Sequence, residues 1–129
     1  MTNILIVDDD PSHLKIYSWI VEKGGFRAVP VLPIGEKVEL PESEPIEIAL
    51  LDYRLGDTLT AADVAKQVKV VFPSAAIVVL SDMMYMPDDV APYANTFVRK
   101  GQPEVLLETL TALAASPKQQ AASPSNPAA

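Results

Sequence analysis

Residues 4–11 have the sequence ILIVDDDP, and this stretch decides the fold that we expect. Ile4–Val7 is an apolar run rich in β-branched residues, which predicts a strand buried on both faces. Three aspartates follow directly, and Asp10 and Pro11 suit the N-cap and the first position of a helix. A buried strand that leads at once into a helix is typical of an α/β domain with a parallel sheet.

The same alternation of apolar runs and helical patterns continues along the chain. Further strands are predicted at residues 26–32, 46–51, 77–80 and 96–98, the first of them interrupted or ended near Pro30 and Pro33. Helices are expected after Asp10, Thr60 and Pro103, with a short one after Pro87 and at most a short one in the proline-rich residues 33–45. Five strands alternating with helices predict a parallel sheet covered on both sides.

Length and composition indicate one folded domain followed by a different segment. The chain has 129 residues, of which 49% are hydrophobic, which fits a single domain with a real core. Residues 1–115 carry the strand and helix patterns. Residues 116–129 contain Ser, Pro, Ala, Gln, Asn and one lysine, and we expect a flexible tail or a truncated linker there.

Charge and the absence of targeting signals exclude several classes of protein. The formal net charge is −7, which disfavours direct binding to nucleic acid. No apolar run approaches the roughly 20 residues of a membrane span, and the start of the chain does not resemble a signal peptide. Cysteine is absent, so disulfides and thiolate metal sites are excluded. We expect a cytoplasmic protein that contacts neither membrane nor nucleic acid.

The polar side chains that suggest chemistry stand where the predicted strands end. Asp8 and Asp9 follow the first strand, Asp52 the third, Ser81 the fourth and Lys100 the fifth. In open α/β sheets, ligands bind at the carboxyl ends of the strands. We therefore expect these five side chains to converge on one edge of the sheet.

Such a cluster has the groups that phosphoryl transfer to an aspartate requires. Neighbouring carboxylates repel, which raises the pKa of at least one of them, and a hard divalent cation such as Mg²⁺ relieves the repulsion. With no histidine or cysteine expected in the cluster, zinc is disfavoured. A carboxylate can attack phosphorus to form an acyl phosphate, while Mg²⁺, the Lys100 ammonium and the Ser81 hydroxyl or nearby amides neutralise the phosphoryl oxygens.

Four segments in order resemble the receiver domains of two-component response regulators. They are ILIVDDD at 4–10, LLDYRL at 50–55, VVLS at 78–81 and FVRKG at 97–101, and the resemblance covers residues 3 to about 115. It implies a flavodoxin-like, doubly wound α/β fold, in which one five-stranded parallel sheet has the order 2-1-3-4-5.

The resemblance also implies roles for individual residues and for partners. Asp52 would be the phosphoacceptor, with Ser81 and Lys100 assisting; Ser81 and Phe97 would form the switch. The Mg²⁺ site would involve the acidic pair and the residues that follow the third strand: Asp8, Asp9, Asp52 and the Arg54 backbone carbonyl. The phosphoryl group would come from a histidine kinase or phosphotransfer protein, and an unknown downstream protein would bind the face of the fourth helix, fifth strand and fifth helix. A homodimer is possible, and no enzymatic activity is expected beyond the domain's own phosphorylation and dephosphorylation.

Two features set this chain apart from the family pattern. Asp82 follows Ser81 where the family usually has a small residue, and a carboxylate there would repel an incoming phosphoryl group. Met83–Met86 is an apolar run that suits either a partner surface or packing against the domain. His13, the single histidine, is expected on the surface without a role.

Two other functions remain open on the sequence. The irregular helices and Asp82 also fit a receiver-like interaction module that is not phosphorylated. Asp8 and Asp10, with Ser81 and Lys100, resemble the motifs of a haloacid-dehalogenase-type phosphatase. The short chain and the lack of an acidic motif after Lys100 count against the phosphatase.

Overall fold

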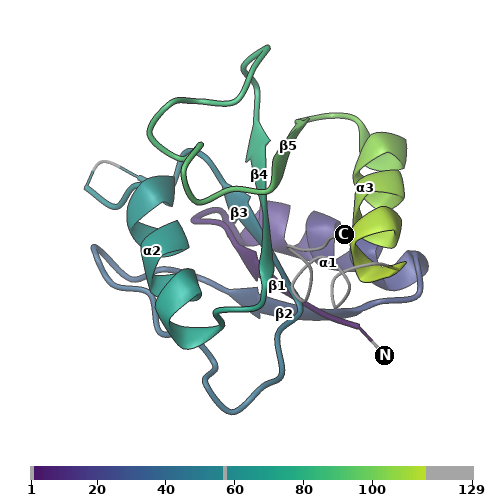
Figure 1. Cartoon of the computed structure of the whole chain (residues 1–129), viewed down its shortest axis with the longest axis horizontal. Coiled ribbons are helices and arrows are strands. Elements are labelled where there is room, and N and C mark those ends of the chain that lie inside the picture. The colour runs from purple at the N-terminus through teal and green to yellow at the C-terminus, as the bar shows by residue number, and fades with distance from the viewer. Residues whose placement is uncertain (1, 57, 116–129) are drawn as a thin grey trace, which may run out of the picture.

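Five parallel strands form one sheet at the centre of the molecule (Figure 1). The computed structural model describes residues 2–56 and 58–115. The strands are β1 (Asn3–Val7), β2 (Arg27–Val31), β3 (Ile48–Asp52), β4 (Ala76–Ser81) and β5 (Thr96–Arg99). Their spatial order is β2-β1-β3-β4-β5, and every neighbouring pair is parallel. The predicted sheet and its strand order are confirmed.

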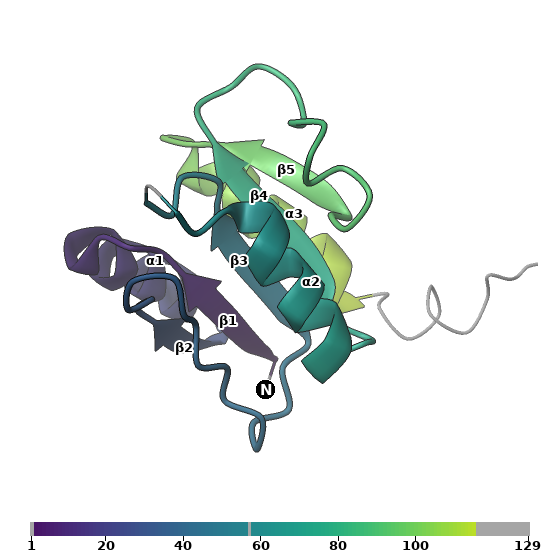
Figure 2. The ribbon, with the colours of Figure 1, turned by 90° about the vertical axis from the view of Figure 1, so that its left-hand side faces the viewer.

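Helices cover both faces of this sheet, as the alternation of elements predicts (Figure 2). The helix α1 (Pro11–Lys23) and the helix α3 (Pro103–Ala115) cover one face, and α2 (Ala61–Val71) covers the other. Successive strand residues alternate between the two cores: Leu5 and Val7 pack with α2, whereas Ile4 and Ile6 pack with α1 and α3. The central strands are therefore buried on both faces.

Two of the helices begin at the caps that the sequence predicts. The Asp10 side chain accepts a hydrogen bond from the Ser12 amide at 2.8 Å, and Pro11 occupies the first helical position. Thr60 Oγ1 accepts from the Asp63 amide at 3.1 Å and caps α2. These caps satisfy amides that the helix itself leaves unpaired, so the polar residues after β1 also fix the direction in which α1 leaves the sheet.

The second strand is not interrupted by Pro30 but ends at Val31, directly after it, so the expectation that the strand ends near Pro30 and Pro33 is confirmed. Pro30 lies in β2 opposite Ile6. Because β2 is an edge strand that pairs only with β1, the nitrogen of Pro30 can face away from the ladder, where no hydrogen bond is lost.

Two connections that could have held short helices contain turns instead. Between β2 and β3, the chain makes an isolated bridge between Ile34 and Lys37 and then a turn from Pro41 to Glu44. Between β4 and β5, residues 88–93 form consecutive turns, so the short helix expected after Pro87 is absent. Pro92 explains this, because proline cannot donate the bond that would continue a helix and clashes with the preceding turn.

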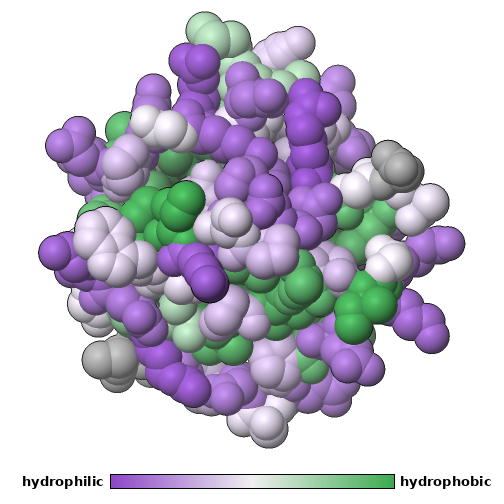
Figure 3. All heavy atoms as spheres, turned by 180° about the vertical axis from the view of Figure 1, so that it is seen from behind, coloured by the Kyte–Doolittle hydropathy of each residue, from purple (hydrophilic) through white to green (hydrophobic). Residues whose placement is uncertain are grey.

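The surface mixes polar and apolar residues. Figure 3 shows apolar patches separated by hydrophilic atoms on the side away from the viewer of Figure 1. Ile16 and Trp19 on α1, and Met84 and Tyr85 after β4, are large side chains that remain exposed. In the described part of the chain, no helix has the length and apolar composition needed to cross a membrane.

Candidate functional site

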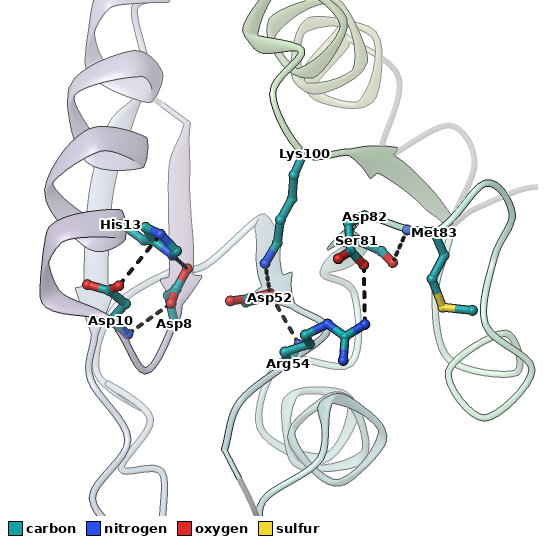
Figure 4. Close-up of polar contacts among 9 residues, drawn as sticks. All are labelled: Asp8, Asp10, His13, Asp52, Arg54, Ser81, Asp82, Met83 and Lys100. Atoms are coloured by element: carbon teal, nitrogen blue, oxygen red, sulfur yellow. Dashed lines mark hydrogen bonds and ion pairs between the residues drawn. The ribbon is translucent and has the colours of Figure 1, made fainter.

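The carboxyl edge of the sheet gathers polar side chains from four strands (Figure 4). Asp8 follows β1, Asp52 is the last residue of β3, Ser81 is the last residue of β4, and Lys100 follows β5. Parallel strands carry these side chains to the same edge because each strand ends there. The expected convergence of these residues is therefore observed.

Asp52 and Lys100 form the central pair of the cluster. Lys100 Nζ lies 2.8 Å from Asp52 Oδ1, and the same oxygen accepts a hydrogen bond from the Arg54 amide at 3.2 Å. Burial lowers the pKa of Lys100, but the hydrogen bond to Asp52 and its negative charge outweigh this effect and raise the pKa above its usual value. The ammonium is thus held in its charged form beside a carboxylate that is almost fully buried.

Asp8 is a second buried carboxylate, and only one of its two oxygens accepts a hydrogen bond. Its Oδ1 accepts from the Asp10 amide at 2.9 Å, whereas its buried Oδ2 has no hydrogen-bond partner. Burial raises the pKa of Asp8 to about 6; the Asp10 hydrogen bond opposes this rise and the charge of Asp52 adds to it. A divalent cation at this edge would relieve both the repulsion and the unpaired oxygen, so these residues fit a Mg²⁺ ion.

An open cleft of about 790 Å³ gives access to this edge of the sheet. Asp9, with an exposed side chain, lines the cleft together with Asp52, Arg54 and Lys100. The cleft is therefore large enough for a small phosphodonor to approach Asp52.

Ser81 and the residues after it form the other side of the site. The Ser81 side chain is buried, and its Oγ accepts a hydrogen bond from the Met83 amide at 3.0 Å. Asp82 Oδ1 lies 3.5 Å from Arg54 Nη2, and both side chains are more than half exposed. Arg54 thus offsets part of the negative charge that Asp82 brings to the site.

Solved structures with the same architecture include response regulator receiver domains. A CheY-like receiver domain protein from Methanospirillum hungatei superposes with a TM-score of 0.79 at 22% identity, over 93% of this chain and 98% of that one. The beryllofluoride-activated DrrB receiver domain gives 0.70 at 25% identity, over 89% and 98% of the two chains. The response regulator TrrA from Thermotoga maritima, in complex with Mg²⁺ and beryllofluoride, gives 0.69 at 20% identity, over 88% and 99%. No family model and no curated protein matches the sequence. This chain has the fold of a response regulator receiver domain.

Phe97, the expected switch aromatic, is not a member of the polar cluster at the carboxyl edge. Phe97 lies in β5 opposite Val79, half-buried against the core on the α2 side of the sheet. The residue two positions further along β5, Arg99, is the one paired with Ser81. Phe97 is linked to the site along β5, which leads to Lys100, and through its neighbour β4, which ends at Ser81.

The expected partner face of the receiver fold needs a correction. Because residues 82–95 hold turns in place of a helix, a face made of the fourth helix, fifth strand and fifth helix does not exist in that form. Its remaining elements are β5, α3 and the loop of residues 82–95. Within that loop Met84 and Tyr85 are exposed, while Met86 packs against the core. The apolar run Met83–Met86 therefore contributes both to the surface and to the packing of the domain.

His13 is half-exposed, as expected of a surface residue, and lies at this edge of the sheet. Its Nδ1 lies 3.5 Å from Asp8 Oδ2 and its Nε2 lies 3.6 Å from Asp10 Oδ2 (Figure 4). The signal available in the sequence was the position of His13 three residues after the cap residue Asp10, on the first turn of the helix that leaves the site. The strand-end pattern alone therefore did not reveal that a histidine nitrogen lies beside these carboxylates.

Proposed function

We propose that this protein is a phosphorylation-dependent switch of a two-component phosphorelay. Asp52 accepts a phosphoryl group, with Mg²⁺, from a histidine kinase or phosphotransfer protein in the cytoplasm, and the phosphorylated domain signals by contact with another protein. The observation that carries this proposal is the buried Asp52 carboxylate with Lys100 Nζ at 2.8 Å and the half-satisfied Asp8 beside it. On a receiver fold, these groups provide a nucleophile, a fixed cation and a place for a metal ion.

The chemistry follows from the positions of the charges. A carboxylate oxygen of Asp52 forms a bond to phosphorus while the bond from phosphorus to the donor atom breaks, which leaves an acyl phosphate on Asp52. Lys100 stabilises negative charge on the transferred group. Asp8, Asp9, Asp52 and the Arg54 backbone carbonyl would hold Mg²⁺, which supplies a second positive charge to the phosphoryl oxygens. The protein acts as the acceptor, and no other substrate is turned over.

The switch itself would involve Ser81 and Phe97. In the unphosphorylated protein the Ser81 hydroxyl accepts from the Met83 amide, and it would turn to donate to a phosphoryl oxygen on Asp52. That movement displaces the loop of residues 82–95, against which Phe97 can then repack. The output surface is then β5, α3 and this loop, which carries exposed Met84 and Tyr85.

The proposal is tested by phosphorylation with a small donor. The protein is incubated with Mg²⁺ and acetyl phosphate and its intact mass is recorded, with Asp52→Asn as the critical variant. Asp88→Asn, which changes an exposed aspartate after β4, is the matched control. We expect one phosphoryl group on the wild type and on Asp88→Asn, and none on Asp52→Asn. An unmodified wild type, or a modified Asp52→Asn, would overturn the proposal.

A receiver-like module that is not phosphorylated is the second candidate. Asp82 favours it, because its exposed carboxylate lies beside Ser81 and is only partly offset by Arg54. In that case Asp52→Ala would bind its protein partner as tightly as the wild type and the wild type would not bind Mg²⁺. The phosphatase has less support, because the Asp10 carboxylate caps α1 through the Ser12 amide.

A further inference from the structure

The single histidine of the chain lies against two buried carboxylates. We propose that His13, Asp8 and Asp52 form a site for a divalent transition-metal ion, such as Co²⁺ or Zn²⁺, which competes with Mg²⁺ for the two carboxylates. Within the described residues, ligand atoms of these three side chains lie within 4.8 Å of one another. The regulatory meaning of this site rests on the proposed function, whereas the binding itself does not.

Two buried atoms of this cluster make no hydrogen bond. Asp8 Oδ2 and His13 Nδ1 are both buried and make no hydrogen bond, although they are 3.5 Å apart. Two ligands that bind one tetrahedral ion at about 2.1 Å are separated by about 3.4 Å. The spacing of these two atoms therefore suits a shared metal ion. Leaving both atoms unpaired would be costly.

A carboxylate also lies close to the second ring nitrogen of His13. Asp10 Oδ2 lies 3.6 Å from Nε2, on the opposite side of the ring from Asp8. A metal-bound histidine usually directs its second nitrogen towards a carboxylate or carbonyl, which keeps the proton there and leaves the other nitrogen free to bind the ion. Asp10 occupies this position, because as the cap of α1 it is fixed by its bond to the Ser12 amide.

Asp52 can take part without breaking its contact with Lys100. Lys100 and the Arg54 amide contact Oδ1 of Asp52, and Figure 4 shows the second oxygen directed towards Asp8 and His13. Two carboxylates also balance the charge of a divalent ion. The open cleft beside His13 and Asp52 leaves a further position for water.

The imidazole of His13 determines which metal ions the proposed site of His13, Asp8 and Asp52 prefers. Mg²⁺ favours oxygen ligands and keeps several waters, whereas imidazole favours first-row transition metals such as Co²⁺ and Zn²⁺. A receiver site with His13 thus gives transition metals an extra ligand that Mg²⁺ does not use. An ion held there occupies Asp8 and Asp52 and would keep Mg²⁺ away from the phosphoacceptor.

The experiment measures binding of Co²⁺ to the full chain without any phosphodonor. Calorimetry and the visible absorption of Co²⁺ give affinity and coordination, and the His13 ring resonances report contact directly, since no other histidine is present. We expect His13→Ala to weaken Co²⁺ binding by about tenfold or more while Mg²⁺ binding stays unchanged. Lys15→Ala, an exposed neighbour on α1, should bind both ions as the wild type does.

The outcomes separate this inference from the proposed function. Equal Co²⁺ affinity of the wild type and His13→Ala, or His13 resonances that do not respond to Co²⁺, would overturn the transition-metal site. Retained Mg²⁺ binding in His13→Ala shows that the variant is folded. Binding of Co²⁺ that requires His13, in a protein that acetyl phosphate cannot modify, would support this site and overturn only the phosphorelay proposal.

Discussion

Asp8 brings a buried negative charge to the site, and that charge should cost stability when no cation is bound. Its pKa is raised to about 6, mainly by burial and further by the charge of Asp52. A carboxyl with a raised folded pKa contributes stability that is fully present below its unfolded pKa of about 4 and is lost as pH rises through the folded pKa. Without metal, this group therefore opposes folding increasingly between about pH 4 and pH 7.

Replacement of Asp8 by asparagine should stabilise the cation-free protein at neutral and alkaline pH. Asparagine keeps an oxygen for the Asp10 amide and removes the buried charge, so we expect the free energy of unfolding to rise by about 1–2 kcal/mol at about pH 8. Urea unfolding in the presence of a chelator measures this. The gain should shrink at about pH 4, and Asp9→Asn, at an exposed neighbour, should change little. A less stable Asp8→Asn at the higher pH would contradict the prediction.

The Arg54–Asp82 pair should regulate the rate at which Asp52 reacts. Both side chains are more than half exposed and lie 3.5 Å apart, so each modulates the charge seen by an anionic phosphodonor. Asp82→Ala should speed modification by acetyl phosphate about two- to fivefold at low salt, and Arg54→Ala should slow it. Timed intact-mass spectra at low and high salt give the rates. Glu108→Ala on α3 is the control for net charge, and an unchanged rate in Asp82→Ala would show that Asp82 has no influence.

Residues at strand ends were predictable, whereas residues that depend on side-chain direction were not. Asp8, Asp52 and Lys100 meet because the strand order alone places them at one edge. His13 reaches Asp8 only because the capped first turn of α1 directs its ring back towards β1, and Arg54 reaches Asp82 across a loop. Neither contact follows from the hydrophobic pattern of the sequence.

At the scale of elements, the apolar runs predict the strands well and the prolines predict the breaks less reliably. Each predicted strand lies within about two residues of the observed one. The three central strands, β1, β3 and β4, are buried along their whole length, which explains their continuous apolar runs. Pro30 leaves open whether the strand is interrupted there or ends just after it, because proline is tolerated within an edge strand, and only the complete sheet shows that β2 is one. The short helix expected after Pro87 is absent, because Pro92 lies within the residues that would have formed it.

The loop between β4 and β5 is expected to depend on one buried valine for its packing. Val90 is fully buried in the core on the α2 side, although the loop has no helix. Val90→Ala should lower the free energy of unfolding by about 1–3 kcal/mol, because it leaves a cavity that the turns cannot fill. Urea denaturation measures the loss. Val70→Ala is the matched control, since Val70 on α2 is 81% exposed, and equal losses in the two variants would show that the loop is not held by Val90.

At the scale of the whole molecule, the site connects four of the five strands. Side chains at the carboxyl ends of β1, β3, β4 and β5 meet there, so unfolding of any of these strands destroys the site. A ligand that binds only the assembled edge must therefore stabilise the complete fold by mass action. If Asp52 is phosphorylated as proposed, the same coupling would connect that event to surfaces on both sides of the sheet.

Thermal unfolding with Mg²⁺ and beryllofluoride should show this coupling. Beryllofluoride mimics a phosphoryl group on an aspartate, and at about 100 times its dissociation constant it should add about 2.7 kcal/mol to stability. For a domain of this size that corresponds to a rise in Tm of about 10 °C. Asp52→Asn removes the attachment point and should show no rise, while Asp88→Asn should respond as the wild type does. Lys100→Ala should respond weakly, because the ammonium 2.8 Å from Asp52 would no longer neutralise the bound group. A full rise of Tm in Asp52→Asn would mean that beryllofluoride does not act at Asp52. The proposal of Asp52 as the phosphoacceptor would then be contradicted.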